Sequence, residues 1–166
     1  MNYNGLLLTL PKEIKMFLAT FVIVLSIGYF TGLLFVNQTS TANPAGVEEN
    51  YLGNEDDPDA SEMKFRKGGR EMLTIVHTHI LSMSFIFFLL GGIMVFSSLP
   101  QKLKFFLIIE PFISILATFG GIYFMWEGIL WMKYIVVISG ILMTLIFTTS
   151  VLILLYQLLF KKNNLK

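Results

Sequence analysis

The chain has 166 residues, of which 55% are hydrophobic and only 14% are charged, and its formal net charge is +1. Soluble proteins carry about 25% charged residues, so this chain lacks the polar side chains that would cover a water-exposed surface. The composition excludes a nucleic-acid-binding protein and a disordered chain, and it predicts a membrane protein. Because the chain contains no cysteine, it also excludes a disulfide scaffold, thiolate iron–sulfur and zinc sites, and covalent c-type haem attachment.

Four apolar stretches are long enough to cross a bilayer, which takes about 20 residues in a helix. They are Met16–Val36, Met72–Leu99, Phe105–Met125 and Tyr134–Phe160. Inside hydrocarbon the backbone polar groups must be paired within the segment, which favours helices. The sequence therefore predicts an all-α integral membrane four-helix bundle, in a single domain over residues 1–166. The short Asn2–Lys15 segment, broken at Pro11, is expected to lie in the membrane interface.

An even number of spans places both termini on one side of the membrane. Seven basic residues lie on that side and five on the other. The first group is Lys12, Lys15, Lys102, Lys104, Lys161, Lys162 and Lys166, and the second is Lys64, Arg66, Lys67, Arg70 and Lys133. By the positive-inside rule, we expect both termini in the cytoplasm of a bacterium and the long 37–71 connection outside its inner membrane.

The 37–71 connection is rich in Asn, Gly, Pro and acidic residues, with Glu55, Asp56, Asp57 and Asp59 close together. These carboxylates offer oxygen ligands to a cation, but their spacing does not match the calcium-binding loop pattern. We expect a solvated acidic loop, with cation binding or partner docking as the alternative. The basic segment 64–70 that follows is expected to contact lipid headgroups and to pair with these acids, or else to dock an acidic partner.

Two histidines, His77 and His79, lie within the second predicted span, where polar side chains are costly and usually functional. Two residues apart, they point about 200° away from each other around a helix, so one ion is not easily held by both. His79 and Met83 are one turn apart on one face, and this pair of residue types binds haem iron and copper. The candidate cofactor-binding residues are thus His77, His79 and Met83, with haem b or a metal ion as the cofactor and a further ligand from another methionine or a partner chain.

A different polar site would pair His77 with Glu127, which is expected at the same membrane level. Trp126, Trp131 and Tyr134 would roof this site, and it could hold a metal ion, bind a quinol headgroup or relay a proton. The simpler interpretation is that the histidines form hydrogen bonds between helices and that the aromatic residues form an interfacial belt. The sequence leaves both interpretations open.

Glu110 is the only acid in the interior of a predicted span, and it precedes Pro111. The proline removes a backbone donor and loosens the preceding turn. One interpretation is that the Glu110 side chain extends toward Lys102 or Lys104 at the nearby membrane face. The alternative is a proton-carrying carboxyl group, for which the evidence would be a buried acid that faces the bundle.

Small residues mark possible close contacts between helices. Gly28 and Gly32 form a GxxxG motif in the first span, Ala117 and Gly121 form a weaker analogue in the third, and Gly91-Gly92 thins the second. Small side chains let membrane helices approach each other. These positions are expected to serve either the bundle itself or a contact between chains.

Residues Val76–Gly91, which read VHTHILSMSFIFFLLG, resemble small bacterial four-span membrane proteins of unassigned function whose second helix opens with His-Thr-His. More distantly, a His-x-His entry to an apolar helix is similar to helices of haem-copper-type membrane proteins. Those helices typically have glycine near the position of Met83 or Ser84, which this chain lacks. The resemblance implies a haem or metal role for His77 and His79.

Taken together, these features favour an accessory subunit of a redox or respiratory complex that contacts a haem, metal or quinone through His77 and His79. A cofactor-free structural or assembly protein is the alternative, and a transporter element is a third possibility. The expected partners are the lipid bilayer and other membrane subunits or a second copy of the chain, and no nucleic acid. No residue set is typical of a catalytic site, so we do not expect an enzyme.

Overall fold

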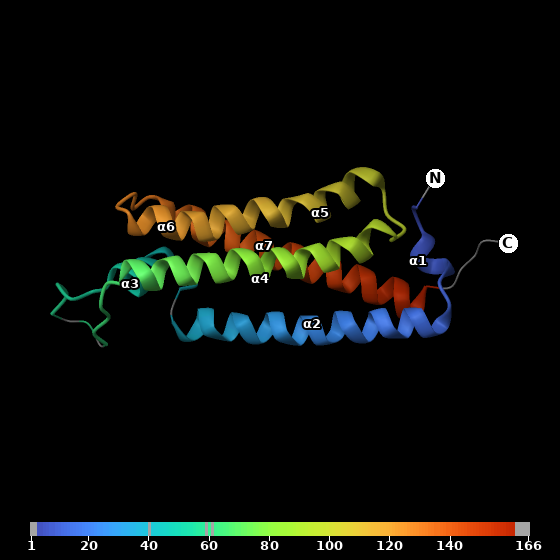
Figure 1. The fold of residues 1–166 in the computed structure, drawn as a ribbon, viewed down its shortest axis with the longest axis horizontal. Coiled ribbons are helices and arrows are strands. Elements are labelled where there is room, and N and C mark those ends of the chain that lie inside the picture. The colour runs from blue at the N-terminus through green and yellow to red at the C-terminus, as the bar shows by residue number, and fades with distance from the viewer. Residues whose placement is uncertain (1–2, 40, 59, 61, 162–166) are drawn as a thin grey trace.

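The computed structural model of the protein describes residues 3–39, 41–58, 60 and 62–161. Within this part of the chain the regular elements are all helices. In chain order they are α1 (Leu6–Thr9), α2 (Lys12–Gln38), α3 (Pro44–Leu52), α4 (Gly69–Val95), α5 (Gln101–Ile115), the π-helical turn η1 (Leu116–Gly120), α6 (Gly121–Trp126), α7 (Met132–Leu155) and the π-helical turn η2 (Tyr156–Phe160). The long helices run side by side, with α3 near one end of the bundle and α1 near the other (Figure 1). These ends are called the α3 end and the α1 end.

The predicted all-α fold with four long apolar helices is confirmed. Helices long and apolar enough to cross a membrane cover Lys12–Gln38, Gly69–Val95, Gln101–Trp126 and Met132–Phe160. Helix α4 ends at Val95 rather than at the predicted Leu99. The chain turns there through backbone hydrogen bonds to the last turn of α4, and Pro100 then precedes α5.

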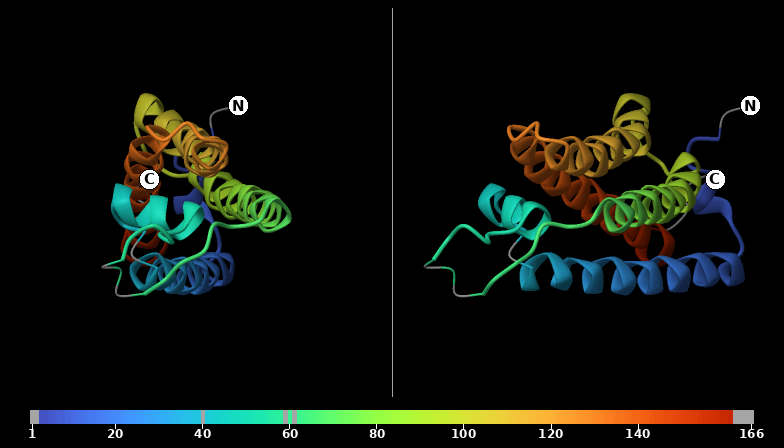
Figure 2. Two further views of the ribbon diagram at one scale, coloured as in Figure 1. Left: turned by 90° about the vertical axis from the view of Figure 1, so that its left-hand side faces the viewer. Right: turned by 60° about the vertical axis from the view of Figure 1, so that its left-hand side comes forward.

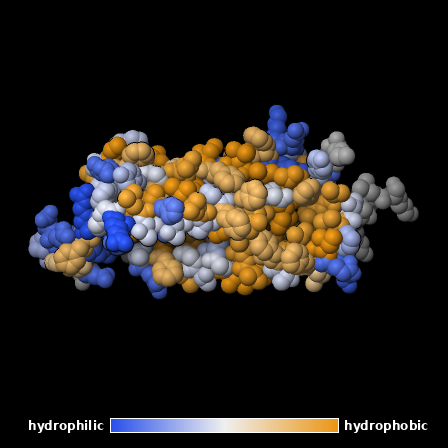
Figure 3. All heavy atoms as spheres, in the orientation of Figure 1, coloured by the Kyte–Doolittle hydropathy of each residue, from blue (hydrophilic) through white to orange (hydrophobic). Residues whose placement is uncertain are grey.

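The four long helices are buried to different extents. In the most apolar window of each, half of the residues of Gln101–Trp126 are buried, compared with 22% in α4 and 17% in α2. Helices α2 and α4 therefore present wide uncovered apolar faces, and α2 lies along one side of the bundle (Figure 2). Hydrophobic side chains dominate the middle of the molecule and hydrophilic ones gather at its ends (Figure 3). This distribution matches a bilayer with its two interfaces.

One aromatic cluster joins three of the long helices. Phe147 on α7 is fully buried, and the Tyr29 ring of α2 stacks on it with a centroid distance of 3.8 Å. Phe87 on α4 meets Phe147 edge to face at 5.9 Å. The Tyr29 hydroxyl lies 3.2 Å from that of Thr144, so its polar end is paired inside the bundle.

The glycines divide into packed and open positions. A Cβ atom added at Gly121 would lie 2.9 Å from Cγ2 of Val136, so the contact between α6 and α7 requires glycine there. By contrast, an added Cβ at Gly28 or Gly32 would meet nothing within 4 Å. The GxxxG motif therefore does not pack within this chain, and its use between chains stays a prediction.

At the α1 end the N-terminal segment packs two of its leucines against the bundle, and its interfacial position stays a prediction. Leu7 and Leu8 are buried, and the Leu7 N–H donates to the Phe96 carbonyl at 2.9 Å. Packing against the end of the bundle removes the side chains of these leucines from water, which is favourable. Gln157, also buried, accepts from the Ser98 N–H at 2.7 Å and fixes the turn between α4 and α5 to η2.

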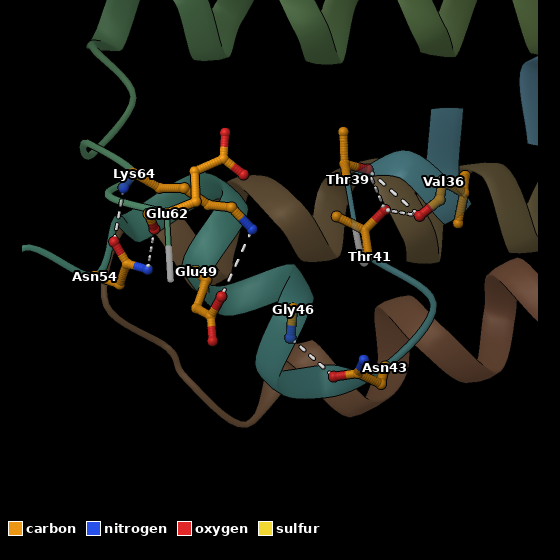
Figure 4. Close-up of polar contacts among 9 residues, drawn as sticks. All are labelled: Val36, Thr39, Thr41, Asn43, Gly46, Glu49, Asn54, Glu62 and Lys64. Carbon is orange, nitrogen blue, oxygen red and sulfur yellow. Dashed lines mark hydrogen bonds and ion pairs between the residues drawn. The ribbon is translucent and has the colours of Figure 1, made fainter. Parts of the chain in front are cut away.

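At the α3 end, the part of the 37–71 connection that forms α3 packs against α6 and α7. The Asn43 side chain caps α3 by accepting from the Gly46 N–H at 2.9 Å (Figure 4). Lys133 of α7 forms a salt bridge of 2.5 Å with Glu48. The Tyr51 side chain of α3 is partly buried against the hydrophobic core, and this burial raises the pKa of its phenol above the usual value.

Beyond α3, the chain forms a turn that carries the acidic residues. The Asn54 side chain accepts from the Lys64 N–H at 2.7 Å and donates to the Glu62 carbonyl at 3.0 Å, which closes the turn (Figure 4). Lys64 also lies 3.6 Å from Glu49, so the expected pairing of the basic segment with acids occurs here. Residues 55–58 are exposed, and Asp59 lies outside the described residues.

Candidate functional site on helix α4

Helix α4 has a packed face and an open face. Met72, Phe87, Leu90 and Met94 are buried in the bundle. The opposite face of the first three turns is exposed and unusually polar for a membrane span. Its exposed residues are Thr74, His77, Thr78, Leu81, Ser82 and Phe85, and this set is called the polar face of α4. It lies in the half of the helix nearest the α3 end.

His79 is held in one orientation by its neighbours. Its Nδ1 atom lies 2.7 Å from the Ile75 carbonyl oxygen, which can only accept a hydrogen bond, so Nδ1 carries the proton. The ring also stacks on Phe119 with a centroid distance of 4.9 Å and an interplanar angle of 28°. The neutral ring then presents its lone pair on Nε2, and the imidazole as a whole is exposed. This is the arrangement that metal-ligating and proton-accepting histidines adopt.

His77 is also exposed, about 200° around the helix from His79. Its predicted partner, Glu127, is also exposed and accepts a hydrogen bond from Tyr123. Met83, predicted to assist His79, is half-buried and packs against the core. The structure thus leaves both imidazoles on the surface and directs the methionine inward.

A complete metal site is not formed by this chain alone over the described residues. Within them, no group of three or more His, Asp or Glu side chains is placed to hold a metal ion. A metal ion bound at His77 or His79 would therefore need ligands beyond the described His, Asp and Glu side chains. The same holds for a ligand set that includes Met83, whose side chain contributes to core packing.

The aromatic residues expected to roof this site have other contacts. The Trp126 indole N–H donates to the Lys67 carbonyl at 2.8 Å, and the Arg66 guanidinium lies 5.2 Å from the centre of the ring. Arg66 also donates to the Trp126 carbonyl at 2.7 Å. Trp126 thus anchors the long connection to α6, while Trp131 and Tyr134 are exposed. Their positions match an interfacial belt.

Glu110 lies on the part of α5 that faces the bundle, and its side chain is buried. It accepts a hydrogen bond from the Ser114 hydroxyl one turn away. The expected extension toward Lys104 is not found, because that ammonium group donates to the Ser97 carbonyl at 2.6 Å. Lys102 is exposed. The structure therefore agrees with the geometry of the alternative interpretation, an acid that faces the bundle.

Two contacts at these positions were not predicted from the sequence. Ser114 follows Glu110 by four residues, and this spacing on a helix is a signal that could have identified the pair. Phe119, which stacks on His79, carries no such signal, because it lies 40 residues away within η1 and its direction depends on the π-helical turn. Only the folded bundle shows this contact.

The fold and the uncovered apolar surface define a multi-pass membrane protein of four long helices. Comparison with family models matches residues 41–165 to the family named Aq_1264_TM, described as a transmembrane helical domain. The match covers most of the chain, and the protein belongs to this family. Comparisons with curated proteins and with solved structures found no match. The matched region begins after α2, so the first long helix lies outside the family domain.

Proposed function

We propose that this protein is an accessory subunit of a membrane complex and that it binds another membrane polypeptide through the polar face of α4. The observation that carries this proposal is the exposure of His77 on this face of a membrane-spanning helix, with His79 exposed at the border of the packed face. Polar and ionisable side chains in spans almost always face a bundle interior or an aqueous cavity, because hydrocarbon offers them no hydrogen bonds. A partner helix with polar side chains would supply those bonds and cover Thr74, Thr78 and Ser82 as well.

In the redox form of this proposal, His79 approaches a haem, a metal ion or a quinone headgroup at the contact with the partner. Two features support it. The hydrogen bond from Nδ1 to Ile75 fixes the ring, and it leaves Nε2 as the nitrogen that can accept a hydrogen bond or bind a metal. The partner would supply the remaining ligands, and the sequence resemblance to His-x-His helices of haem-copper-type proteins points the same way.

In the assembly form, the same histidines form only hydrogen bonds to the partner helix. A hydrogen bond between membrane helices contributes about 0.6 to 2 kcal/mol, enough to select one register of contact. The open glycines Gly28 and Gly32 on α2 would provide a second contact, either to the same complex or to a second copy of the chain.

We further propose that both termini face the cytoplasm of a bacterium and that α3 lies outside its inner membrane. Helix α1 contacts η2, so the first and last helical segments that the structure describes lie at the same end of the bundle. The distribution of basic residues gives the direction, with seven on the terminal side and five on the other.

The test is purification in a mild detergent of the wild type, the double variant His77→Leu/His79→Leu, and the control Thr149→Leu. Thr149 is an exposed polar residue on α7 whose hydroxyl bonds only to its own helix, to the Leu145 carbonyl. We expect the wild type and the control to retain one stoichiometric membrane partner and the double variant to lose it. Circular dichroism would show whether each variant is folded.

The visible spectrum and metal content of the same samples separate the two forms. The redox form predicts a Soret band or stoichiometric metal in the wild type. The single variant His79→Leu should lose this signal while the partner stays bound. Loss of the partner from the double variant, with no chromophore or metal in the wild type, supports the assembly form. Equal partner recovery from all variants, together with no chromophore or metal, would refute the proposed function.

A further inference from the structure

Glu110 occupies a position deep within the membrane-spanning part of the bundle. It lies nine residues after the start of α5 at Gln101, or about 14 Å along a helix. This is close to half of the roughly 30 Å thickness of the bilayer core. The side chain is only 8% exposed, so neither water nor lipid headgroups solvate it.

The carboxyl group has one paired and one unpaired oxygen. Its Oε1 atom accepts a hydrogen bond from Ser114. Its Oε2 atom is buried without any hydrogen-bond partner, and no other buried side-chain nitrogen or oxygen within the described residues is left in this state. A buried polar atom without a partner is costly, and in a native structure it calls for an explanation.

No cation compensates this carboxyl group among the described residues. Helices α4 and α7 pack against α5, and their charged and imidazole side chains all lie toward the α3 end, away from Glu110. These are Arg70, Glu71, His77, His79 and Lys133. On α5 itself, Lys104 donates to the Asn4 side chain and to the carbonyls of Val95 and Ser97. A carboxylate at this position would thus be a buried charge without a counterion, which is strongly unfavourable.

The helix around Glu110 is irregular on its C-terminal side. Pro111 has no N–H, so the Leu107 carbonyl lacks its usual helical donor. One turn later, η1 changes the hydrogen-bond pattern from α to π between Leu116 and Gly120. Single π-helical turns inside α-helices occur frequently at functional sites, and they allow the helix to rearrange locally. The acid therefore lies next to the most adaptable part of this span.

We propose that Glu110, positioned by Ser114, is an intramembrane proton-binding site. A proton on Oε2 removes the buried charge and turns the unpaired acceptor into a donor, while Oε1 keeps its bond from Ser114. On release, the Oε2–H bond breaks, its electron pair stays on the carboxylate, and a water molecule that enters the loosened turn accepts the proton. The site belongs to the interior of the bundle and does not depend on the polar face of α4.

The proposal is tested with dicyclohexylcarbodiimide, a lipid-soluble reagent that reacts with protonated carboxyl groups in apolar surroundings. Purified protein in detergent is treated, digested and analysed by mass spectrometry. We expect the adduct at Glu110, with no adduct in Glu110→Gln and unchanged labelling in the control Glu13→Gln, which alters an exposed acid. A water-soluble carbodiimide should leave Glu110 unmodified. No adduct at Glu110 in folded wild-type protein would overturn the proposal.

Infrared spectroscopy gives an independent readout that needs no reagent. A protonated carboxyl group has a C=O stretching band above the amide I region, and that band shifts in D2O. We expect the wild type and Ser114→Ala to show this band and Glu110→Gln to lack it. If Glu110→Gln fails to fold, labelling and the band in the wild type at neutral pH still decide the question. A wild-type spectrum without the band would show that the carboxyl group is ionised and would overturn the proposal.

Discussion

Replacing Gly121 with alanine should weaken the packing between α6 and α7. The added Cβ atom would lie 2.9 Å from Cγ2 of Val136, whereas carbon atoms pack best at about 3.5–4.0 Å. Val136 is buried and β-branched, so it cannot easily rotate away and the two helices must separate. Overpacking of this kind costs about 1–3 kcal/mol, and the higher helix propensity of alanine offsets up to about 1 kcal/mol. We expect a net loss of about 1 kcal/mol in the free energy of unfolding.

The assay is titration of the detergent-solubilised protein with sodium dodecyl sulfate, followed by tryptophan fluorescence. The two tryptophans of the chain, Trp126 and Trp131, flank the junction between α6 and α7 and therefore report on this contact. A loss of 1 kcal/mol raises the unfolding equilibrium constant about fivefold. The matched control is Gly28→Ala, whose added Cβ meets nothing within 4 Å, so only the helix-propensity gain remains and stability should stay unchanged or rise by up to about 1 kcal/mol. Wild-type stability of Gly121→Ala, or a larger loss for Gly28→Ala, would refute this reasoning.

Three further predictions address the two ends of the bundle. Gln157→Leu leaves the Ser98 N–H and carbonyl without side-chain partners, so the free energy of unfolding in the same titration should fall by about 1–3 kcal/mol. Trp126→Phe removes the hydrogen bond to the long connection, and a protease should cut that connection faster than in the wild type, while an unchanged rate would contradict the anchoring role. Because the chain has no cysteine, Asp56→Cys and Lys102→Cys report orientation: a membrane-impermeant maleimide should label the first but not the second in intact cells, and the reverse result would invert the proposed topology.

The sequence alone predicted the four long helices, because a run of about 20 uncharged residues has few other solutions inside hydrocarbon. The residue at which α4 ends was harder to predict from the sequence. Residues Phe96–Leu99 carry no charge and include two large apolar side chains, and the turn there depends on Gln157, which is distant in sequence. The folded connection around α3 was also missed, because its acidic and polar composition resembles that of a solvated loop.

The candidate sites were predictable as residues but not as contacts. His77, His79 and Glu110 stand out because polar side chains are rare in spans. Whether each faces the bundle or the surface depends on the rotation of its helix, which weakly amphipathic spans do not reveal. The structure buries Glu110 in the bundle and exposes both imidazoles, and Glu127 accepts a hydrogen bond from Tyr123. The glycines of the GxxxG motif contact no other helix of this chain, whereas Gly121, at the end of the weaker motif, lies in a close contact between two helices.

The central claim, that the polar face of α4 binds another membrane polypeptide, is tested most directly by photo-crosslinking in cells. A photoreactive residue replaces Leu81 on that face or Leu145 on α7, which are 58% and 59% exposed and lie at similar depths, 12 and 13 residues from the α3 ends of their helices. We predict a discrete protein adduct from position 81 that is absent when His77 and His79 are also replaced by leucine, and only lipid labelling from position 145. Equal lipid labelling at both positions, or an adduct at position 81 that persists without the histidines, would contradict the claim.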